Sequence, residues 1–216
     1  MIDHHLPIEK TARFWTRGPA DAPELWVVLH GYKQLARRFL RRFEPIDDGS
    51  RFIVAPEALS RFYVSNEPGR HGPSSIVGAT WMTREDRETE IADYVGYLDR
   101  LLGHVGAEGR TSVTVLGFSQ GVATASRWVT LGSVRPDRVL LWGDVSPPDL
   151  DLERARSAFS GVEVTLVRGR ADGAFASRLV EEERARLSAA GVDYRIEEYE
   201  GGHDIDPETL VTLATG

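Results

Sequence analysis

The sequence predicts an α/β protein with a mostly parallel central sheet and helices on both of its faces. Short apolar segments alternate along the chain with longer amphipathic ones, which is the pattern of strand–helix–strand units. No internal repeat, low-complexity tract or long linker interrupts them. A chain of 216 residues with 41% hydrophobic content can bury one sizeable core. We therefore expect residues 1–216 to form a single domain.

Strands are expected where short apolar runs end at Gly, Pro or charged residues. Most of these runs are rich in Val, Leu and Ile, as is typical of strands buried on both faces. In chain order they are 25–29, 51–55, 111–116, 138–142, 162–167 and 194–199.

Helices are expected between these runs. Residues 35–43 place Leu35, Phe39 and Phe43 on one stripe, with the arginines of 37–42 outside it. We expect those arginines to form a solvated face rather than a site that recruits an anion. The other expected helices show apolar periodicity or opposite charges four residues apart, and they are 84–102, one beginning at Val122, 175–190 and 207–213.

Composition narrows the class of protein. The formal net charge of −7 disfavours a non-specific nucleic-acid surface. The chain has no cysteine, which excludes disulfides, thiolate metal sites and a cysteine nucleophile. Residues 1–10 lack the apolar core of a secretory signal, and no apolar run approaches the roughly 18 residues of a membrane span. We expect a cytoplasmic protein with no stable membrane insertion.

The most informative motif is Gly117-Phe118-Ser119-Gln120-Gly121, between the expected strand 111–116 and the helix that follows. Strand, G-x-S-x-G and helix in this order form the context of a nucleophile elbow, a strained turn that lifts the serine Oγ above the sheet. Glycines two residues before and after the serine leave room for neighbouring backbone. Ser119 is therefore the candidate nucleophile.

A serine hydroxyl needs a base to take its proton near neutral pH. Of the six histidines, His203 fits this role best, because it lies in a Gly-rich loop after the last strand and follows the serine in the chain. A loop histidine that only caps the final helix is the alternative. His30 stands too early in the chain for the base, and we expect it to shape its loop by hydrogen bonding.

A serine nucleophile and its histidine base need a third residue, an acid, that orients His203 and stabilises its charged form. Asp172 is preferred, because its loop follows the strand 162–167 and immediately precedes the last strand and the histidine loop. Asp144, one strand earlier, remains the alternative. Asp204 and Asp206 are too close to His203 in the chain, and we expect them to cap the final helix.

Acyl transfer also needs donors for the oxyanion of the tetrahedral intermediate. The backbone N–H of Gln120, at the start of the helix after the elbow, is one candidate. The N–H of Tyr32, in the loop after the first expected strand, is the other, with Gly31 beside it in the substrate pocket.

A Gly/Pro/Ser-rich passage lies within residues 60–83, which we treat as a candidate lid or pocket wall. Phe62, Tyr63 and Trp81 flank this passage. They either line an apolar acyl pocket or fill the space under a long loop, and the sequence favours neither.

Together these residues resemble the phospholipase/carboxylesterase family of α/β-hydrolases, which includes acyl-protein thioesterases and small carboxylesterases. The matching pieces span nearly the whole chain: Leu29-His30-Gly31, Ala55-Pro56-Glu57, the G-F-S-Q-G motif, the loop 169–172 and Gly202-His203. The resemblance implies the α/β-hydrolase fold, a triad of Ser119, Asp172 and His203, an oxyanion hole made by the Tyr32 and Gln120 amides, and neither metal nor cofactor. It leaves monomer and homodimer open.

We expect a serine carboxylic-ester hydrolase that cleaves small to medium acyl esters through an acyl-enzyme intermediate. A thioesterase or a lysophospholipase would use the same triad. A non-catalytic binding protein on a hydrolase scaffold is the alternative of a different class, and it usually lacks a triad member. After His-Gly the family usually has a small residue, Gly and Asp, whereas this chain has Tyr32-Lys33-Gln34. We expect the larger Tyr32 side chain to line or narrow the mouth of the site.

Overall fold

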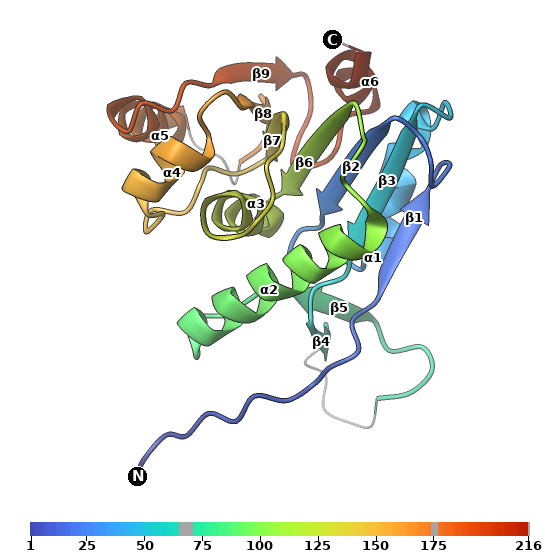
Figure 1. Ribbon diagram of the computed structural model, residues 1–216, viewed down its shortest axis with the longest axis vertical. Coiled ribbons are helices and arrows are strands. Elements are labelled where there is room, and N and C mark those ends of the chain that lie inside the picture. The colour runs from blue at the N-terminus through green and yellow to red at the C-terminus, as the bar shows by residue number, and fades with distance from the viewer. Residues whose placement is uncertain (65–70, 174–176, 216) are drawn as a thin grey trace.

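The computed structural model describes residues 1–64, 71–173 and 177–215, and its central feature is a seven-stranded sheet (Figure 1). The strands are β1 (Phe14–Arg17), β2 (Glu24–Leu29), β3 (Arg51–Pro56), β4 (Ser60–Tyr63), β5 (Val77–Thr80), β6 (Ser112–Phe118), β7 (Arg138–Trp142), β8 (Glu163–Gly169) and β9 (Arg195–Tyr199). The helices are α1 (Ala36–Leu40), the 3-10 helix η1 (Arg41–Ile46), α2 (Arg87–Val105), α3 (Gln120–Leu131), α4 (Leu152–Ala158), α5 (Ser177–Ala189) and α6 (Pro207–Thr215).

The order of the strands across the central sheet is β1-β3-β2-β6-β7-β8-β9. Neighbouring strands from β3 to β9 run parallel, and β1 pairs antiparallel with β3 at one edge. This arrangement confirms the α/β fold with a mostly parallel sheet. β4 and β5 form a separate antiparallel hairpin.

Successive residues of the central strands enter two different cores. In β2, Leu25 and Val27 belong to the core under α2 and α3, whereas Trp26 and Val28 belong to the core under α1, η1 and α6. The sheet is thus covered on both faces, as the apolar character of its strands predicts (Figure 1).

The expected strands of the central sheet are all present, and the structure adds elements that the sequence analysis missed: β1, β4, β5 and α4. All are short, and the residues of β1, β4 and α4 are largely exposed or half-buried, so their apolar pattern is weak. β5 is mostly buried, but it has only four residues, one of them a glycine. The helix expected over 35–43 was wrong in its extent. It ends as an α-helix at Leu40 and continues as the 3-10 helix η1, which contains Pro45.

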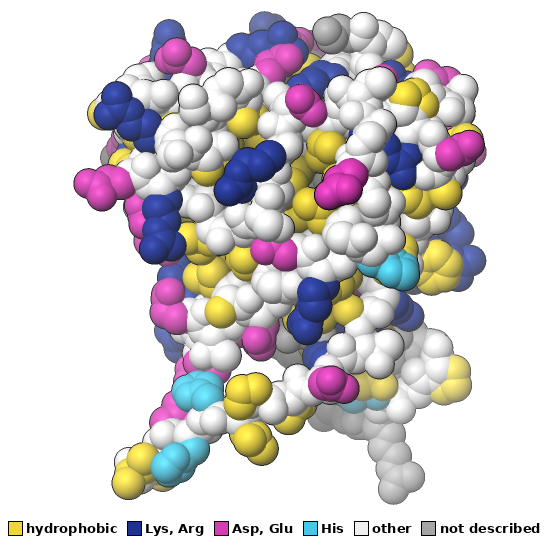
Figure 2. Space-filling view, in the orientation of Figure 1, with side chains coloured by type: hydrophobic (Ala, Val, Ile, Leu, Met, Phe, Trp, Pro, Cys, Tyr) yellow, Lys and Arg dark blue, Asp and Glu magenta, His cyan; other side chains and the backbone are white. Residues whose placement is uncertain are grey.

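The candidate lid 60–83 contains the β4–β5 hairpin, and residues 65–70 within it lie outside the described part of the chain. Its role as a lid stays a prediction. The amino-terminal residues precede β1 as an extended arm that leaves the body of the molecule and carries the exposed side chains of Ile2, Leu6 and Ile8 (Figure 2). Over the described residues, no helix is long and apolar enough to cross a membrane.

The carboxyl ends of the parallel strands meet along one edge of the sheet, and every residue of the expected triad follows one of them. Ser119 comes directly after β6, Asp172 follows β8, and His203 follows β9. In open parallel sheets this is the edge where ligands bind.

Because α3 packs closely on the sheet, we expect a side chain added at one glycine of this helix to destabilise the protein strongly. A Cβ at Gly121 would lie far inside van der Waals contact of the Leu29 carbonyl oxygen, which is backbone and cannot move aside. Gly121→Ala should therefore lower the free energy of unfolding by about 2 kcal/mol or more in urea denaturation.

The matched control is Gly96→Ala in α2, where a Cβ would meet nothing within 4 Å. This substitution should raise the free energy of unfolding by up to about 1 kcal/mol, because it removes backbone freedom from the unfolded chain. Equal effects of the two substitutions would contradict the packing described here.

Candidate active site

Ser119 occupies a strained turn between β6 and α3. Its φ of 53° and ψ of −121° lie in a region that L-residues rarely adopt. Its N–H donates to the Trp142 carbonyl at 2.8 Å, and its carbonyl accepts from the Val122 N–H at 2.8 Å. A Cβ on Gly117 would collide with the Gly121 backbone, so only glycine allows the turn to close. The half-buried serine is thereby held at the end of β6.

His203 and Asp172 are directly joined. The Nδ1 of His203 lies 2.6 Å from the Oδ2 of Asp172, although 31 positions separate the two residues. The Asp172 side chain is 1% exposed and the His203 side chain 35% exposed. The carboxylate is therefore shielded from water, while the imidazole reaches the surface of the site.

Main-chain contacts hold together the loop after β8, which carries Asp172, and the loop after β9, which carries His203. The N–H of Arg170 donates to the Tyr199 carbonyl, and the N–H of Ala171 donates to the Gly201 carbonyl, each at 2.9 Å. A Cβ on Gly169 would collide with the Gly201 carbonyl oxygen, so the two backbones pass in direct contact. The Asp172–His203 distance is thus set by the backbone and not by the side chains alone.

Tyr199 fixes the histidine loop from inside. Its hydroxyl lies 2.7 Å from the Gly202 carbonyl oxygen and 2.5 Å from that of Asp204, on either side of His203. The Trp142 indole N–H donates to the same Asp204 carbonyl at 2.9 Å. Neither residue was expected at the site from the sequence; an aromatic residue at the end of each of two strands was the only available signal.

The imidazole of His203 packs against the elbow and the neighbouring loop. Its ring centroid lies 5.0 Å from that of Phe118, the residue before Ser119. A Cβ on Gly143 would lie 3.2 Å from His203 Cε1, so glycine leaves the space that the ring uses. These contacts bring His203 to the same end of β6 as Ser119.

Asp144, the alternative acid, lies at the same edge but has a different environment. Its Oδ1 accepts from the Val145 N–H at 2.8 Å. Burial raises the pKa of Asp144, the negative charges of Asp172 and Glu183 add to this effect, and the nearby His203 opposes it. Between the two candidate acids, Asp172 is the one that hydrogen-bonds to His203.

The loop after β2 is fixed by three side chains. The His30 ring is fully buried, with Nδ1 2.8 Å from the Gly31 carbonyl oxygen and Nε2 accepting from the Ala58 N–H. Gln34 Oε1 accepts from the Gly31 N–H at 2.9 Å. The Trp81 indole N–H donates to the His30 carbonyl at 2.8 Å. The Gly31–Tyr32 peptide plane, which carries the Tyr32 N–H, is therefore held in one orientation.

The two backbone groups expected to bind an oxyanion remain available. Among the described residues, neither the Tyr32 N–H nor the Gln120 N–H donates to a protein acceptor. A Cβ on Gly31 would lie 3.1 Å from the Ser119 Cβ, so this loop touches the elbow directly. The position of Gln120 at the start of α3 adds the partial positive charge of a helix N-terminus.

The side chain of Gln120 joins the elbow to the end of β5. Its Nε2 donates to Thr80 Oγ1 at 2.9 Å and to the Met82 carbonyl at 3.0 Å, and its Oε1 accepts from the Trp81 N–H at 3.2 Å. From the sequence, a role was expected only for the backbone of this residue. The G-F-S-Q-G motif therefore positions the wall of the site as well as the serine.

The expected pocket aromatics lie in three different places. Phe62 stacks on Tyr32, with ring centroids 5.4 Å apart, and Tyr32 itself is 51% exposed. Tyr63 stacks on His71. Trp81 is 2% exposed and packs under the loop after β2, so it supports the site from below instead of facing an open cavity.

Asp206 accepts from the Thr209 N–H at 2.9 Å and caps α6 as expected, whereas Asp204 forms an ion pair with Arg42.

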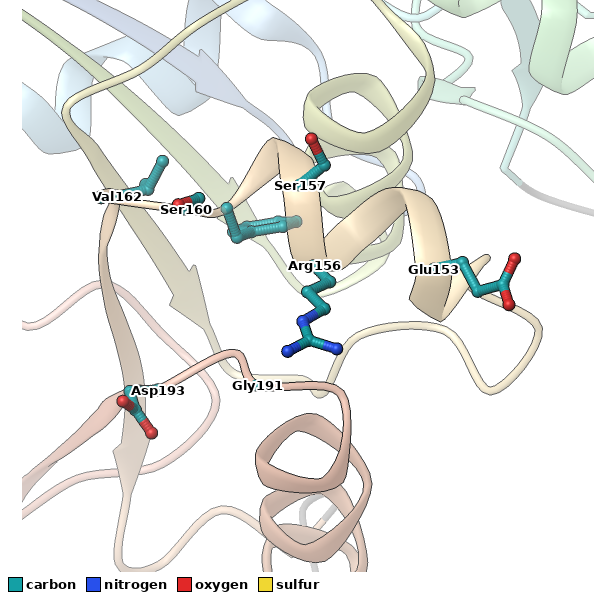
Figure 3. A pocket seen from close by; sticks show the side chains of 9 residues that line it. Glu153, Arg156, Ser157, Ser160, Val162, Gly191 and Asp193 are labelled. Atoms are coloured by element: carbon teal, nitrogen blue, oxygen red, sulfur yellow. The ribbon is translucent and has the colours of Figure 1, made fainter.

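A hollow of about 630 Å³ lies between α4 and the loop after α5, lined by residues that include Arg156, Gly191 and Asp193 (Figure 3). These residues precede β8 and β9, so this hollow opens at the sheet edge opposite Ser119.

Solved structures with the same fold are numerous. Esterase PE8 is 21% identical, with a TM-score of 0.69 over 95% of this chain and 97% of that one. Zea mays acyl-protein thioesterase 2 is 18% identical, with a TM-score of 0.72 over 95% and 97%. The Bacillus cereus carboxylesterase is 13% identical, with a TM-score of 0.62 over 94% and 92%.

No family model and no curated protein matches the sequence. The three structures named are those of an esterase, an acyl-protein thioesterase and a carboxylesterase. The chain thus has the α/β-hydrolase fold that its motifs resemble.

The hydrogen bonds of His30 predict how its ring titrates. Burial lowers the pKa of His30 below the usual 6.5, and Nε2 must stay unprotonated to accept from Ala58. Nitrogen-edited NMR should show this imidazole neutral, with its proton on Nδ1, as the pH falls from 7 through 6.5.

The unfolded chain binds a proton at His30 below pH 6.5 and the native ring does not, so unfolding takes up a proton there. This group therefore lowers the free energy of unfolding by up to about 1.4 kcal/mol per pH unit as the pH falls. A His30 ring that titrates at or above 6.5 in the folded protein would contradict this assignment.

Proposed function

We propose that the protein is a serine hydrolase that cleaves carboxylic esters of small to medium acyl groups through an acyl-enzyme intermediate. The observation that carries the proposal is the 2.6 Å contact between His203 Nδ1 and Asp172 Oδ2, formed beside the strained turn of Ser119. With Nδ1 committed to the carboxylate, Nε2 of His203 is left to accept the serine proton.

In the first half of the reaction, Ser119 Oγ attacks the acyl carbonyl carbon while His203 Nε2 takes the hydroxyl proton. Asp172 holds the imidazole in the tautomer with hydrogen on Nδ1 and stabilises the imidazolium that forms. The tetrahedral intermediate collapses when His203 returns the proton to the leaving alcohol, which breaks the ester bond and leaves the acyl group on Ser119.

The negative charge that develops on the carbonyl oxygen would be met by the N–H groups of Tyr32 and Gln120. Both are without a protein acceptor among the described residues, and both belong to backbone that is fixed before the substrate arrives. Donors that need no rearrangement stabilise the transition state most effectively. Water then repeats the sequence on the acyl-enzyme and releases the acid.

The Tyr32–Phe62 stack supports a preference for small to medium acyl groups, because two bulky rings stand next to the proposed oxyanion donor. A thioester would react by the same steps. The named neighbours include esterases and an acyl-protein thioesterase, which supports hydrolysis of an ester or thioester bond in general. We propose the ester as the substrate to test first.

A non-catalytic binding protein would be expected to lack one member of the triad. Here the candidate serine, histidine and aspartate are all present, and the last two are hydrogen-bonded. The strained backbone of Ser119 also costs free energy of folding, and a binding protein that does not use this serine would gain nothing in return.

Hydrolysis of p-nitrophenyl esters from acetate to palmitate tests the proposal. The wild type should show its highest kcat/KM at a short or medium chain, and Ser119→Ala should lower that value by at least about 10³-fold. Wild-type rates no higher than those of Ser119→Ala over the whole series would contradict ester hydrolysis.

The two acids provide matched variants in the same assay. Asp172→Asn should lower kcat by about 10³–10⁴-fold, because it removes the charge that orients His203. Asp144→Asn should lower kcat by less than about tenfold, since Asp144 bonds to its own loop. The reverse order would make Asp144 the orienting acid.

A further inference from the structure

A small cavity of about 220 Å³ lies between the loop after β2 and α1, on the side of the proposed catalytic centre. Its polar lining includes Lys33, Arg38 and Arg42, and its apolar lining is Leu35, Phe39 and Val77. The volume corresponds to roughly seven water molecules, which suits a carboxylate or phosphate with a few attached carbons.

Three contacts connect this cavity to the catalytic residues. Lys33 directly follows Tyr32, the proposed oxyanion donor. The ring of Phe39 lies 5.9 Å from that of Phe118, the residue before Ser119. Arg42 forms an ion pair with Asp204, the residue after His203. The lining of the cavity thus includes the residue next to Tyr32 and two residues that contact the chain neighbours of Ser119 and His203.

The basic side chains of the cavity are only partly neutralised. No described carboxylate pairs with Lys33 or Arg38. Arg42 pairs with one carboxylate, that of Asp204, which is half-exposed. The whole chain carries a net charge of −7, so the local charge at this cavity is opposite in sign to the net charge of the protein.

The arginines of this segment are all exposed, as expected from the sequence, but they do not all face the same direction. Arg37 lies over the Trp15 ring and, with Arg41, lines a different hollow. Arg38 and Arg42, four residues apart, line the cavity beside the site. Successive residues of a helix point about 100° apart, so these two pairs face different directions, although each pair spans the change from α1 to η1.

The backbone of Lys33 is held in place as well. Its φ is 66°, in the left-handed region, and its N–H donates to the Ala79 carbonyl at 3.0 Å. A Cβ on Gly78 would lie 2.7 Å from the Lys33 Cα, so the backbones of Lys33 and β5 pass in direct contact. A glycine would adopt this conformation without strain, whereas lysine adds a cation, whose Nζ lies 5.2 Å from the centre of the Tyr32 ring.

We propose that Lys33, Arg38 and Arg42 form an anion subsite that selects substrates with a carboxylate or phosphate group next to the ester being cleaved. The inference rests on the proposed hydrolase function and names its substrate class. The guanidinium groups would bind the anion through charge-assisted hydrogen bonds, and Leu35, Phe39 and Val77 would contact the carbons that join it to the ester.

Pairs of anionic and neutral esters test the subsite and show which part of the substrate carries the charge. The acyl side is tested with p-nitrophenyl hydrogen glutarate against p-nitrophenyl methyl glutarate. The leaving-group side is tested with p-acetoxybenzoate against its methyl ester, and with p-acetoxyphenyl phosphate against its dimethyl ester. In at least one pair, the wild-type kcat/KM of the anionic ester should exceed that of its neutral partner by about three- to tenfold, and added salt should reduce the preference.

Arg38→Gln and Lys33→Gln should each lower this anionic-to-neutral ratio by about three- to tenfold. Arg37→Gln, on the same helix but outside the cavity, should leave the ratio unchanged. A wild type without a preference in any pair, or a ratio that Arg38→Gln and Lys33→Gln do not alter, would overturn the subsite.

A binding measurement separates failure of the subsite from failure of the hydrolase proposal. Glutarate and inorganic phosphate are titrated into the wild type and Arg38→Gln while the arginine Nε–Hε signals are followed by NMR. Binding of either anion that weakens at least about threefold in Arg38→Gln supports the subsite even if no ester is hydrolysed. Absence of binding of both anions to the wild type overturns it even if neutral esters are cleaved.

Discussion

The backbone turn at Ser119 is the constraint on which the rest of the site depends. A residue with a φ of 53° costs of order 1–3 kcal/mol, and it persists because β6 and α3 are buried on either side of it. Gly117 and Gly121 allow this turn, since a Cβ at either position would collide with backbone. The serine, the start of α3 and the Gln120 N–H are therefore placed by a single rigid feature.

The other two loops of the site are held by the same physical means. Gly31 approaches the Ser119 Cβ, and Gly169 lies against the Gly201 backbone, so glycine again permits direct contact between segments distant in the chain. Buried side chains complete the support, with Tyr199 under the histidine loop and Trp81 under the loop after β2. Main-chain contacts and buried side chains thus hold these loops in place, as preorganised catalysis would require.

Much of this architecture could be predicted from the sequence, because it depends on local pattern. Apolar runs located the central strands, and chain order paired His203 with Asp172, which the structure joins by a hydrogen bond. The side-chain role of Gln120 could not be predicted, since its partner Met82 lies 38 positions away in the chain. The Tyr199 hydroxyl bonds to carbonyls only three and five positions away, but no local sequence pattern marks a contact between a hydroxyl and a carbonyl. The division of the arginines between two hollows was also hidden, because residues distant in the chain complete each hollow, Arg17 in one and Val77 in the other.

The central claim is that Ser119 is an activated nucleophile, and covalent labelling tests it without knowledge of the substrate. The folded protein is incubated with a fluorophosphonate, which reacts with serines activated by a neighbouring base, and the modified peptide is identified by mass spectrometry. The account predicts one adduct per chain, on Ser119, that is absent when the protein is denatured before treatment. A folded protein that stays unlabelled, or one labelled at a different serine, would contradict it.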